Sequence, residues 1–388
     1  MSHYNTILHQ LLTLIPRHHF DRLVEDLDGD RYVKTFSTWN QLTTLLYAQA
    51  SGKDSLREIV NGLAAHGSRS YHLGLAGAVT RSTLADANAN RDWRIYEGLF
   101  YKLLERCRAL APRQKFNFKS PLFSLDATVI DLCLASFPWA KFRQRKGALK
   151  LHYKLEHAGE LPVFLKITDG KEHEISVAKS SFPLVPDSIY CFDRAYIDWS
   201  WFRRILDGGS HFVTRYKRGL KLRWIGTMTR KKGPGVIADL LVEPDIPDSR
   251  EVYPAPMRLI VYRDRQTGKT LRFLTSRFDL AATTIAQIYK ARWQIEIFFK
   301  WIKQNLKIKT FLGTSKNAVM TQVWVAMCYF LLLAYVKFQA RFAASLFYLG
   351  RLVREFVMSR VSLIDLLRLN AARLDRLRRQ DLQLCLQF

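Results

Sequence analysis

The stretch Tyr289–Lys303 reads YKARWQIEIFFKWIK, and the rest of the chain is interpreted from it. At about 100° per residue it predicts one amphipathic helix on which Tyr289, Arg292, Glu296 and Lys303 share an arc of roughly 60°. The neighbouring arc is apolar and is expected to face a core. Its members are Ile288, Ile295, Phe298, Ile302 and Leu306. A carboxylate flanked by two cations and a phenol suits a metal site beside a phosphate backbone. A solvated polar stripe fits the same pattern.

Composition narrows the choice of partner. The chain has 388 residues, enough for two or three domains, and its 48% hydrophobic content can fill a core. Lysine and arginine number 60 against 34 acids, which gives a net charge of +26. A globular protein this basic usually binds a polyanion. Nucleic acid is the first candidate, and an anionic membrane surface is the second.

The cysteines and the N-terminus bear on the compartment. Five cysteines are scattered along the chain and form no CxxC pair, which argues against a disulfide framework or a zinc cluster. A reducing, cytosolic compartment fits this pattern best. The first 20 residues lack a basic n-region and a small-residue cleavage site, so we expect no signal peptide.

One segment has the length of a membrane span. Residues Val319–Val336 are apolar over a length that is just enough to cross a bilayer. Basic residues flank the segment on both sides: Lys316 precedes it, and Lys337 and Arg341 follow it. In a chain this rich in charge, we interpret the segment as a buried helix of a large domain and expect no membrane association.

Residues 1 to about 115 are expected to be helical. Capping boxes at Thr38 with Gln41 and at Ser55 with Glu58 each predict a helix start. A later helix is predicted to begin at Ser82 and carries a polar cluster in and around its first turns. The cluster comprises Arg81, Ser82, Thr83, Asn88, Asn90 and Arg91. This pattern is typical of a helix placed in a DNA groove. An ordinary helical domain with polar turns fits it equally well.

From Lys115 the periodicity changes to that of strands. Three strands, a helix, a strand, a helix and a strand predict a mixed sheet flanked by helices. Residues 218–276 are β-rich, broken by Gly and Pro turns, and show no helical period, so we expect a β insertion there. The tail from Arg351 is rich in leucine and arginine and predicts a basic amphipathic helix.

Two acids are predicted to lie where strands end, Asp126 in FSLDAT and Asp193 in YCFDRAY. With Glu296 they form a candidate cluster of three carboxylates, and hard cations such as Mg²⁺ prefer oxygen ligands. Two such ions can activate the attacking oxygen and stabilise the leaving oxygen in phosphodiester displacement. Asp131 is an alternative to Asp126, and Asp198 is an alternative to Asp193.

Other chemistries have less support. His152 and His173 are left out of the catalytic set because lone histidines are more often structural. The chain contains no GxxxxGK[ST] loop, which argues against an ATP-driven enzyme.

The spacing Tyr289-x2-Arg292-x3-Glu296-x6-Lys303 resembles the Tyr-Arg-Glu-Lys signature of bacterial insertion-sequence DDE transposases of the insertion sequence four family. Asp126 within LDATVIDL and Asp193 within FDRAY resemble the first and second catalytic acids of that family. N-terminal stretches such as RSTLADANANRDWRIYE resemble the N-terminal domain of one branch. The resemblance covers about residues 15–345.

The resemblance implies an α/β fold: a ribonuclease H-like catalytic core with a β-strand insertion and a helical N-terminal DNA-binding domain. The organisation expected from it has five parts. They are 1–115, the helical DNA-binding domain; 116–217, the first part of the core; 218–276, the insertion; 277–345, the second part of the core; and 346–388, a helical basic tail.

The resemblance also implies a mechanism. Asp126, Asp193 and Glu296 would bind Mg²⁺, with Mn²⁺ able to substitute. Water would nick one strand at the element's end, and the freed 3′-hydroxyl would attack the opposite strand, giving a hairpin, or attack target DNA. Tyr289, Arg292 and Lys303 would contact phosphates. An aromatic residue of the insertion would hold a flipped base, and Trp224 is the candidate.

The expected partners are double-stranded transposon ends and target DNA, bound by a homodimer in the bacterial cytoplasm at the nucleoid. Two other functions stay open at this point. The chain can be a catalytically inactive DNA-binding protein derived from a transposase. It can also be a peripheral membrane protein that uses residues 319–336.

Overall fold

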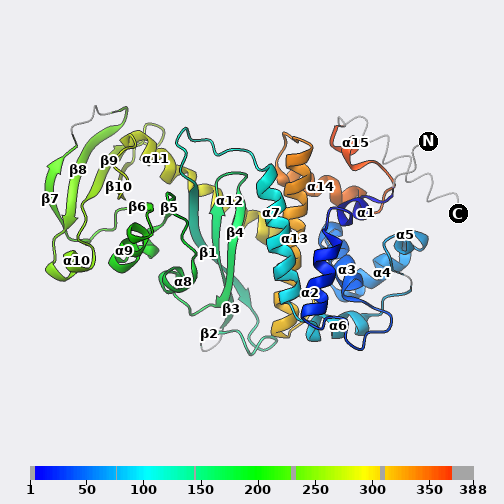
Figure 1. The fold of residues 1–388 in the computed structure, drawn as a ribbon. Coiled ribbons are helices and arrows are strands. Elements are labelled where there is room, and N and C mark those ends of the chain that lie inside the picture. Colours follow the sequence, from blue (N-terminus) through cyan, green and yellow to red (C-terminus); the bar gives the residue numbers. More distant parts are fainter. Residues whose placement is uncertain (1–4, 76, 144–145, 229–232, 306–310, 369–388) are drawn as a thin grey trace. The chain divides into compact units, whose positions relative to one another are not determined.

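The computed structural model describes residues 5–75, 77–143, 146–228, 233–305 and 311–368. The chain divides into two compact units, which are described separately (Figure 1). One comprises Met1–Ala111 and Trp301–Phe388, and the other comprises Pro112–Lys300. The first is called the helical unit here, and the second is called the sheet unit.

The helical unit is built around α13 (Lys316–Gln339), which packs against α3, α6, α7 and α14. Its N-terminal helices are α1 (Ile7–Leu12), α2 (Arg17–Asp26), α3 (Thr38–Ser51), α4 (Leu56–Ala65), α5 (Ser68–Tyr71), α6 (Arg81–Asn90) and α7 (Arg94–Leu110). Its C-terminal helices after α13 are α14 (Leu346–Phe356) and α15 (Leu363–Arg368). The prediction that residues 1 to about 115 are helical is confirmed.

The α13 helix contains the apolar segment Val319–Val336. Among the described residues it is the helix long and apolar enough to cross a membrane, and 94% of its most apolar stretch is buried inside the fold. The polar side chains on it are buried as well: Thr321 is 1% exposed and Gln322 is 3% exposed. The prediction of a buried core helix is confirmed.

Local capping sets the starts of the N-terminal helices. The Ser55 side chain accepts the backbone N–H of Glu58 at 3.2 Å, as the second capping box predicts. The first box is wrong by one residue, because Ser37 caps α3 by accepting from Asn40. Thr38 instead donates its hydroxyl to the carbonyl of Gly29.

The polar cluster at α6 is largely satisfied within the helical unit. The N-cap is Thr80, whose hydroxyl accepts from Thr83, so the predicted N-cap at Ser82 is wrong. Asn88 accepts a hydrogen bond from the buried Gln41 at 2.8 Å. Arg91 donates to the Ser37 carbonyl at 3.0 Å and to Gln41. These two side chains therefore support the helical packing.

The sheet unit contains one mixed sheet (Figure 1). Its strands are β1 (Leu122–Leu132), β2 (Lys141–Arg143), β3 (Lys146–Glu156), β4 (Leu161–Asp169), β5 (Ile189–Phe192), β6 (His211–Arg215), β7 (Leu222–Thr227), β8 (Val236–Pro244), β9 (Met257–Arg263) and β10 (Thr270–Thr275). The order is β2-β3-β1-β5-β6-β10-β9-β8-β7, with β4 also paired to β3. β1 pairs parallel to β5 and β5 parallel to β6, whereas β3 is antiparallel to β1 and to β4.

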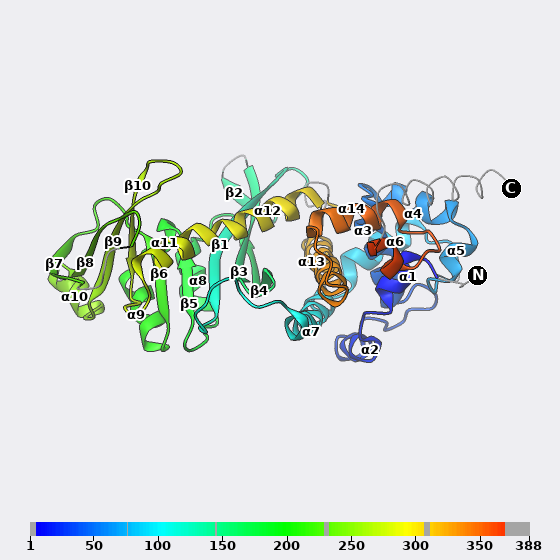
Figure 2. The same cartoon turned by 90° about the horizontal axis from the view of Figure 1, so that it is seen from above.

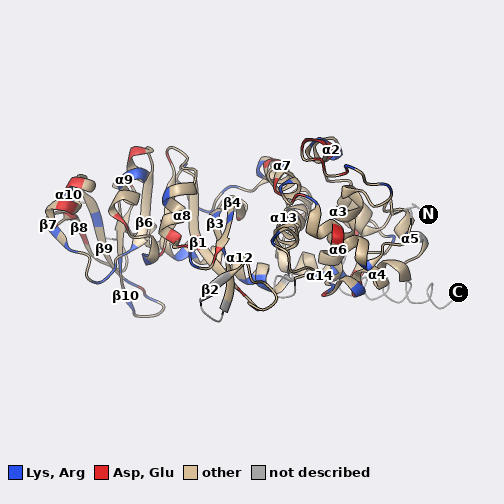
Figure 3. Cartoon of the chain, turned by 90° about the horizontal axis from the view of Figure 1, so that it is seen from below, with Lys and Arg blue, Asp and Glu red and all other residues tan. Residues whose placement is uncertain are grey.

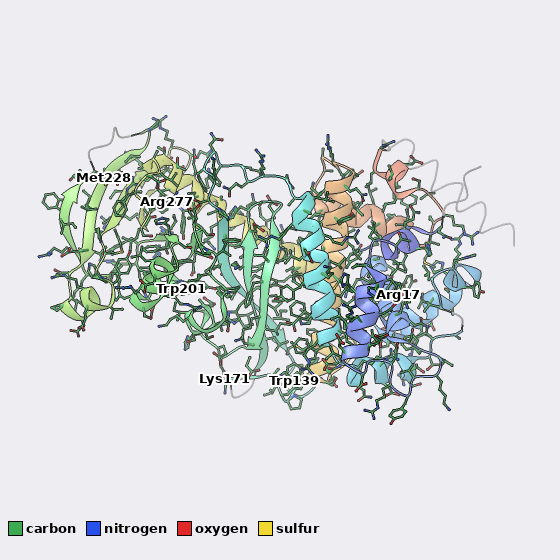
Figure 4. The ribbon with its side chains drawn as sticks, viewed as in Figure 1. Arg17, Trp139, Lys171, Trp201, Met228 and Arg277 are labelled. Atoms are coloured by element: carbon green, nitrogen blue, oxygen red, sulfur yellow. The ribbon has the colours of Figure 1, made fainter. Side chains whose placement is uncertain are left out.

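Helices cover both faces of this sheet. Figure 2 shows α11 (Ala282–Ala291) and the start of α12 (Trp293–Asn305) crossing one face, with α8 (Glu174–Ser181) and α9 (Trp199–Asp207) on the other. Successive strand residues point to opposite faces and so pack in two different cores. Phe123 and Leu125 pack in the core beneath α8 and α9, whereas Leu122 packs in the core beneath α11. Trp201 of α9 is fully buried in the first of these cores (Figure 4).

The predicted β insertion is present as β7–β10. It continues the main sheet, because β10 pairs antiparallel with β6. One short helix interrupts it, α10 (Pro247–Val252), which the sequence did not predict. Pro247 at its first turn is compatible with a helix start, and six residues are too few to show a period.

The stretch Tyr289–Lys303 differs from the single helix that was predicted. It divides at Arg292, where α11 ends and α12 begins one residue later. The division is slight, since the Arg292 N–H still bonds to the Ile288 carbonyl at 3.2 Å. The apolar arc is confirmed where it is described, because Ile288, Ile295 and Ile302 are 0% exposed. Leu306 lies outside the described residues.

Candidate active site

Asp126 lies in the middle of β1, and not at the end of the strand as predicted. Its parallel pairing with β5 nevertheless stops at Leu125, so Asp126 is the first β1 residue beyond that ladder. One carboxylate oxygen, Oδ1, accepts the backbone N–H of Ala127 at 2.8 Å. Burial raises the pKa of Asp126 to about 7, Arg292 acts against this rise, and Asp193 and Glu174 add to it.

Arg292 joins two of the three predicted acids. Its Nη1 donates to Asp126 Oδ2 at 2.8 Å, and its Nη2 donates to Glu296 Oε1 at 2.7 Å. The arginine side chain is 13% exposed, against 17% for Asp126 and 34% for Glu296. The planar guanidinium thus bridges a strand acid and a helix acid.

Asp193 follows β5 directly, as the sequence predicts. Its carboxylate caps the 3-10 turn η1 (Arg194–Tyr196) by accepting the Ala195 N–H at 2.8 Å. Because β1 and β5 are parallel neighbours, Asp193 and Asp126 leave the shared ladder at the same level, with Leu125 opposite Phe192. Both acids therefore lie at one edge of that ladder, where α/β sheets commonly bind ligands.

The alternative acids have other surroundings. Asp198 is the N-cap of α9, accepts the Trp201 N–H at 2.9 Å and pairs with Lys179 at 2.9 Å. Asp131 is exposed near the far end of β1. His152 is buried on β3 against Thr168, with 2.9 Å between Nε2 and the hydroxyl. The geometry favours Asp126 and Asp193 over these alternatives.

Tyr289 and Arg292 border a cleft of about 490 Å³ that lies between the β9–β10 hairpin and α11. The Arg292 guanidinium carbon lies 5.7 Å from the centre of the Tyr289 ring, which packs on Phe273 at 5.1 Å. Trp293 also lines the cleft and is 59% exposed. Trp293 was not predicted from the sequence, although an aromatic residue directly after Arg292 is a signal that could have identified it.

Two further predicted DNA contacts are Trp224 and Lys303. Trp224 is 63% exposed on β7, the edge strand of the insertion. Lys303 is exposed on the last turn of α12, seven residues after Glu296, in the part of this helix that belongs to the helical unit. In the described part of the chain, the ion pairs of Asp126 and Glu296 are with Arg292.

A further acid, Glu174, was missed by the sequence analysis. It is the first residue of α8. Figure 3 colours acidic residues red, including those on α8 and α12. Burial raises the pKa of Glu174, Lys150 opposes this, and the charge of Asp193 adds to the rise. An acid at the first turn of a helix is common, which is why the sequence alone did not single it out.

The donor set suits a hard divalent cation by its chemistry, because every candidate ligand is a carboxylate oxygen. Arg292 supplies the positive charge between Asp126 and Glu296 in this structure. Within the described ranges, no group of three or more acids, histidines and cysteines is arranged to coordinate a metal ion. A buried carboxylate needs a counter-charge, and either the arginine or a cation can provide it.

Comparisons with known proteins agree with this chemistry. Residues 117–331 match the family described as Transposase DDE domain, and residues 3–76 match a domain of unknown function, DUF4372. The protein y4zB of Sinorhizobium fredii, itself classed as a transposase by inference, is 32% identical over 64% of this chain and 69% of its own length. A Geobacillus stearothermophilus protein assigned to insertion sequence element IS5377 is 26% identical over 67% of this chain and 68% of its own.

A solved structure, the piggyBac transposase synaptic complex with hairpin DNA, aligns with a TM-score of 0.45 at 10% identity. It covers 97% of this chain and 84% of that one. The family match spans more than half of the chain and includes both strand acids and the helix acid. The chain therefore belongs to the DDE transposases, enzymes that cut and transfer DNA strands.

Proposed function

We propose that the protein binds the inverted repeats of its own insertion sequence, cuts the DNA there and joins the freed ends to target DNA. Asp126, Asp193 and Glu296 are the acids of the reaction. The observation that carries this proposal is the bridge made by Arg292, which binds Asp126 from 166 residues away and Glu296 within α12. The fold thereby gathers distant acids around one cationic group.

The proposal includes a ribonuclease H-like core. The strand order β4-β3-β1-β5-β6, with β3 as the antiparallel member beside β1, supports it. The same proposal covers the organisation of the chain. It comprises a DNA-binding role for residues 1–115, core segments at 116–217 and 277–345, an insertion at 218–276, and a tail at 346–388.

Mg²⁺ is the proposed cofactor, and Mn²⁺ is expected to substitute for it. When bound, a divalent cation lowers the pKa of the attacking oxygen and stabilises charge on the leaving oxygen. The chain's own groups provide its site: Asp126 and Asp193 from neighbouring strands, and Glu296 from α12. Arg292 is then available to bind a phosphate of the DNA, since guanidinium forms paired hydrogen bonds with phosphate as well as with carboxylate.

The remaining contacts are assigned by position and chemistry. Tyr289, Arg292 and Lys303 contact phosphates near the transposon end, and Trp224 stacks on a base taken out of the duplex. The exposure of Trp224 supports the last assignment. A homodimer on paired ends, working at the bacterial nucleoid in the cytoplasm, completes the proposal.

Cleavage of an end-sequence duplex in Mg²⁺ or Mn²⁺ tests the acids. We expect Asp126→Asn, Asp193→Asn and Glu296→Gln each to lower the rate at least about a hundredfold while DNA binding is kept. Asp131→Asn, an exposed acid on the same strand as Asp126, is the matched control and should cut like the wild type. A wild type that binds ends and never cuts them would support the inactive DNA-binding alternative.

A further inference from the structure

Tyr196 carries a buried hydroxyl whose surroundings point to a ligand. The residue is 0% exposed, and its Oη has no hydrogen-bond partner among the described residues. An unsatisfied buried hydroxyl costs about 1–3 kcal/mol, so such groups are rare without a functional or ligand-related reason. Tyr196 lies in η1, three residues after Asp193, and η1 packs against α8, which begins with Glu174.

Tyr196 ends the turn that Asp193 caps, and this turn packs against α8. Burial raises the pKa of Tyr196 most, and the charges of Asp126, Glu174 and Asp193 raise it further. Three carboxylates from β1, α8 and the end of β5 therefore lie within electrostatic range of one phenol. The charge of Glu174 raises the pKa of Asp126, and the charge of Asp193 raises the pKa of Glu174. Two of these carboxylates, Asp126 and Asp193, belong to the three predicted acids, whereas Glu174 does not.

Glu174 is partly exposed and shares its ion-pair partner with a backbone carbonyl. Its partner is Lys150, with 3.7 Å between Nζ and Oε1. Lys150 also donates to the Glu172 carbonyl at 2.8 Å, so Glu174 is not its sole partner. The helix dipole of α8 would reward an acid at this position by only about 0.3–1 kcal/mol, while the neighbouring acids repel it.

We propose that Glu174 is a further carboxylate ligand for the divalent cation at Asp126 and Asp193, and that the Tyr196 hydroxyl is a positioning group that donates to these carboxylates. This inference rests on the proposed function, because it assumes that the acids bind a cation. A cation removes the repulsion that otherwise opposes the gathering of Glu174, Asp126 and Asp193. The same gathering gives the Tyr196 hydroxyl an acceptor.

Mn²⁺ binding to the full-length protein tests this without any measurement of cleavage. Electron paramagnetic resonance of free Mn²⁺ gives the affinity, measured with and without duplex DNA. We expect Glu174→Gln to weaken Mn²⁺ binding at least about tenfold and Tyr196→Phe to weaken it less. The double variant should bind no more tightly than Glu174→Gln alone, because the hydroxyl also acts through Asp126 and Asp193. Glu172→Gln, an exposed acid two residues away, is the matched control.

Asp126→Asn distinguishes failure of the Glu174 proposal from failure of the proposed metal site. Should Asp126→Asn weaken Mn²⁺ binding while Glu174→Gln binds like the wild type, Glu174 is not a ligand and the proposed function stands. Should neither variant change Mn²⁺ binding, or the wild type bind none with or without DNA, the metal site itself is wrong. Thermal unfolding of each variant shows whether the fold is kept, so a loss of affinity in a folded Glu174→Gln protein supports the proposal.

Discussion

A buried arginine and a partly buried arginine of the sheet unit bind carboxylates in different ways. Arg258 on β9 is 0% exposed and donates to both oxygens of Asp239, at 3.1 and 2.7 Å. Its Nη1 also donates to the carbonyls of Arg277, Phe278 and Leu280, at 2.9, 3.3 and 2.8 Å. Arg292 divides its guanidinium between Asp126 and Glu296, and its Nε has no partner among the described residues.

The two arginines therefore have different roles. Arg258 is saturated by one acid and by the backbone segment that leads into α11, so it ties the insertion to the helix that carries Tyr289. Arg277 at the start of that segment is labelled in Figure 4. Arg292 retains a free N–H and binds acids that are partly exposed, so it can exchange partners. The first arrangement stabilises the fold, and the second suits a site where charges rearrange.

Asp239→Ala should break the first arrangement with the largest loss of stability. It leaves the Arg258 guanidinium buried without its carboxylate, which costs about 3–5 kcal/mol. Urea unfolding measures this loss. Glu243→Ala on the same strand is the control, because its partners Arg223 and Arg250 are 53% and 39% exposed and the loss should stay below about 1 kcal/mol. Similar small losses in both variants would contradict the structural role of Arg258.

Arg292→Gln should show the opposite balance. Its acids are partly exposed and reach water or a cation once the arginine is gone, so we expect a loss of only about 1–2 kcal/mol. Cleavage should fall at least about a hundredfold, because the phosphate contact is lost. Lys290→Gln, an exposed neighbour that donates to Gln266, is the control for stability. An Arg292 variant that cuts normally would remove the arginine from the site.

Much of this could be predicted from the sequence, since the signals were local. The apolar arc at Ile288, Ile295 and Ile302, the hairpin of β3 and β4, and the acid directly after β5 all follow from periodicity. The burial of α13 followed from charge content and flanking residues. The family resemblance then joined Asp126, Asp193 and Glu296 into one candidate site.

What the sequence did not reveal depends on tertiary contacts. The double bridge of Arg292, the buried pair of Arg258 and Asp239, and the internal bonds of Arg91 each join segments far apart in the chain. Glu174 resembles any acid at a helix start until α8 packs on η1. Asp126 was predicted to end its strand, but β1 continues past the point where its pairing with β5 stops. Periodicity cannot show where pairing between two strands stops.

Two histidines of the sheet unit, His152 and His157, are held in the neutral form by burial. Burial lowers the pKa of His152 to about 3 and of His157 to about 4. The unfolded chain, with a histidine pKa near 6.5, therefore binds more protons below that pH, and stability falls as the pH drops from about 6.5 toward 4. Each group contributes at most about 1.4 kcal/mol per pH unit.

His157→Gln tests this window. Its Nε2 lies 2.8 Å from the Ser124 hydroxyl, a contact that glutamine can partly replace. Between pH 6.5 and 5.5 the variant should lose about 1 kcal/mol less stability than the wild type, measured by urea unfolding at both pH values. His173→Gln, an exposed histidine, should follow the wild type. Parallel curves for all three proteins would show that His157 is protonated in the fold.

Trp224 should show the smallest effect on stability and a clear effect on DNA. It is 63% exposed on an edge strand, so Trp224→Ala should change the free energy of unfolding by less than about 0.5 kcal/mol. If it holds a displaced base, the fluorescence of 2-aminopurine placed near the cut should change when the wild type binds and stay at the free-duplex value with the variant. Ile225→Ala, 40% exposed on the same strand, is the matched control. Equal fluorescence with the Trp224 variant and the wild type would show that Trp224 does not hold the base. Trp293 would then be the next candidate, because it lies beside Arg292 and is similarly exposed.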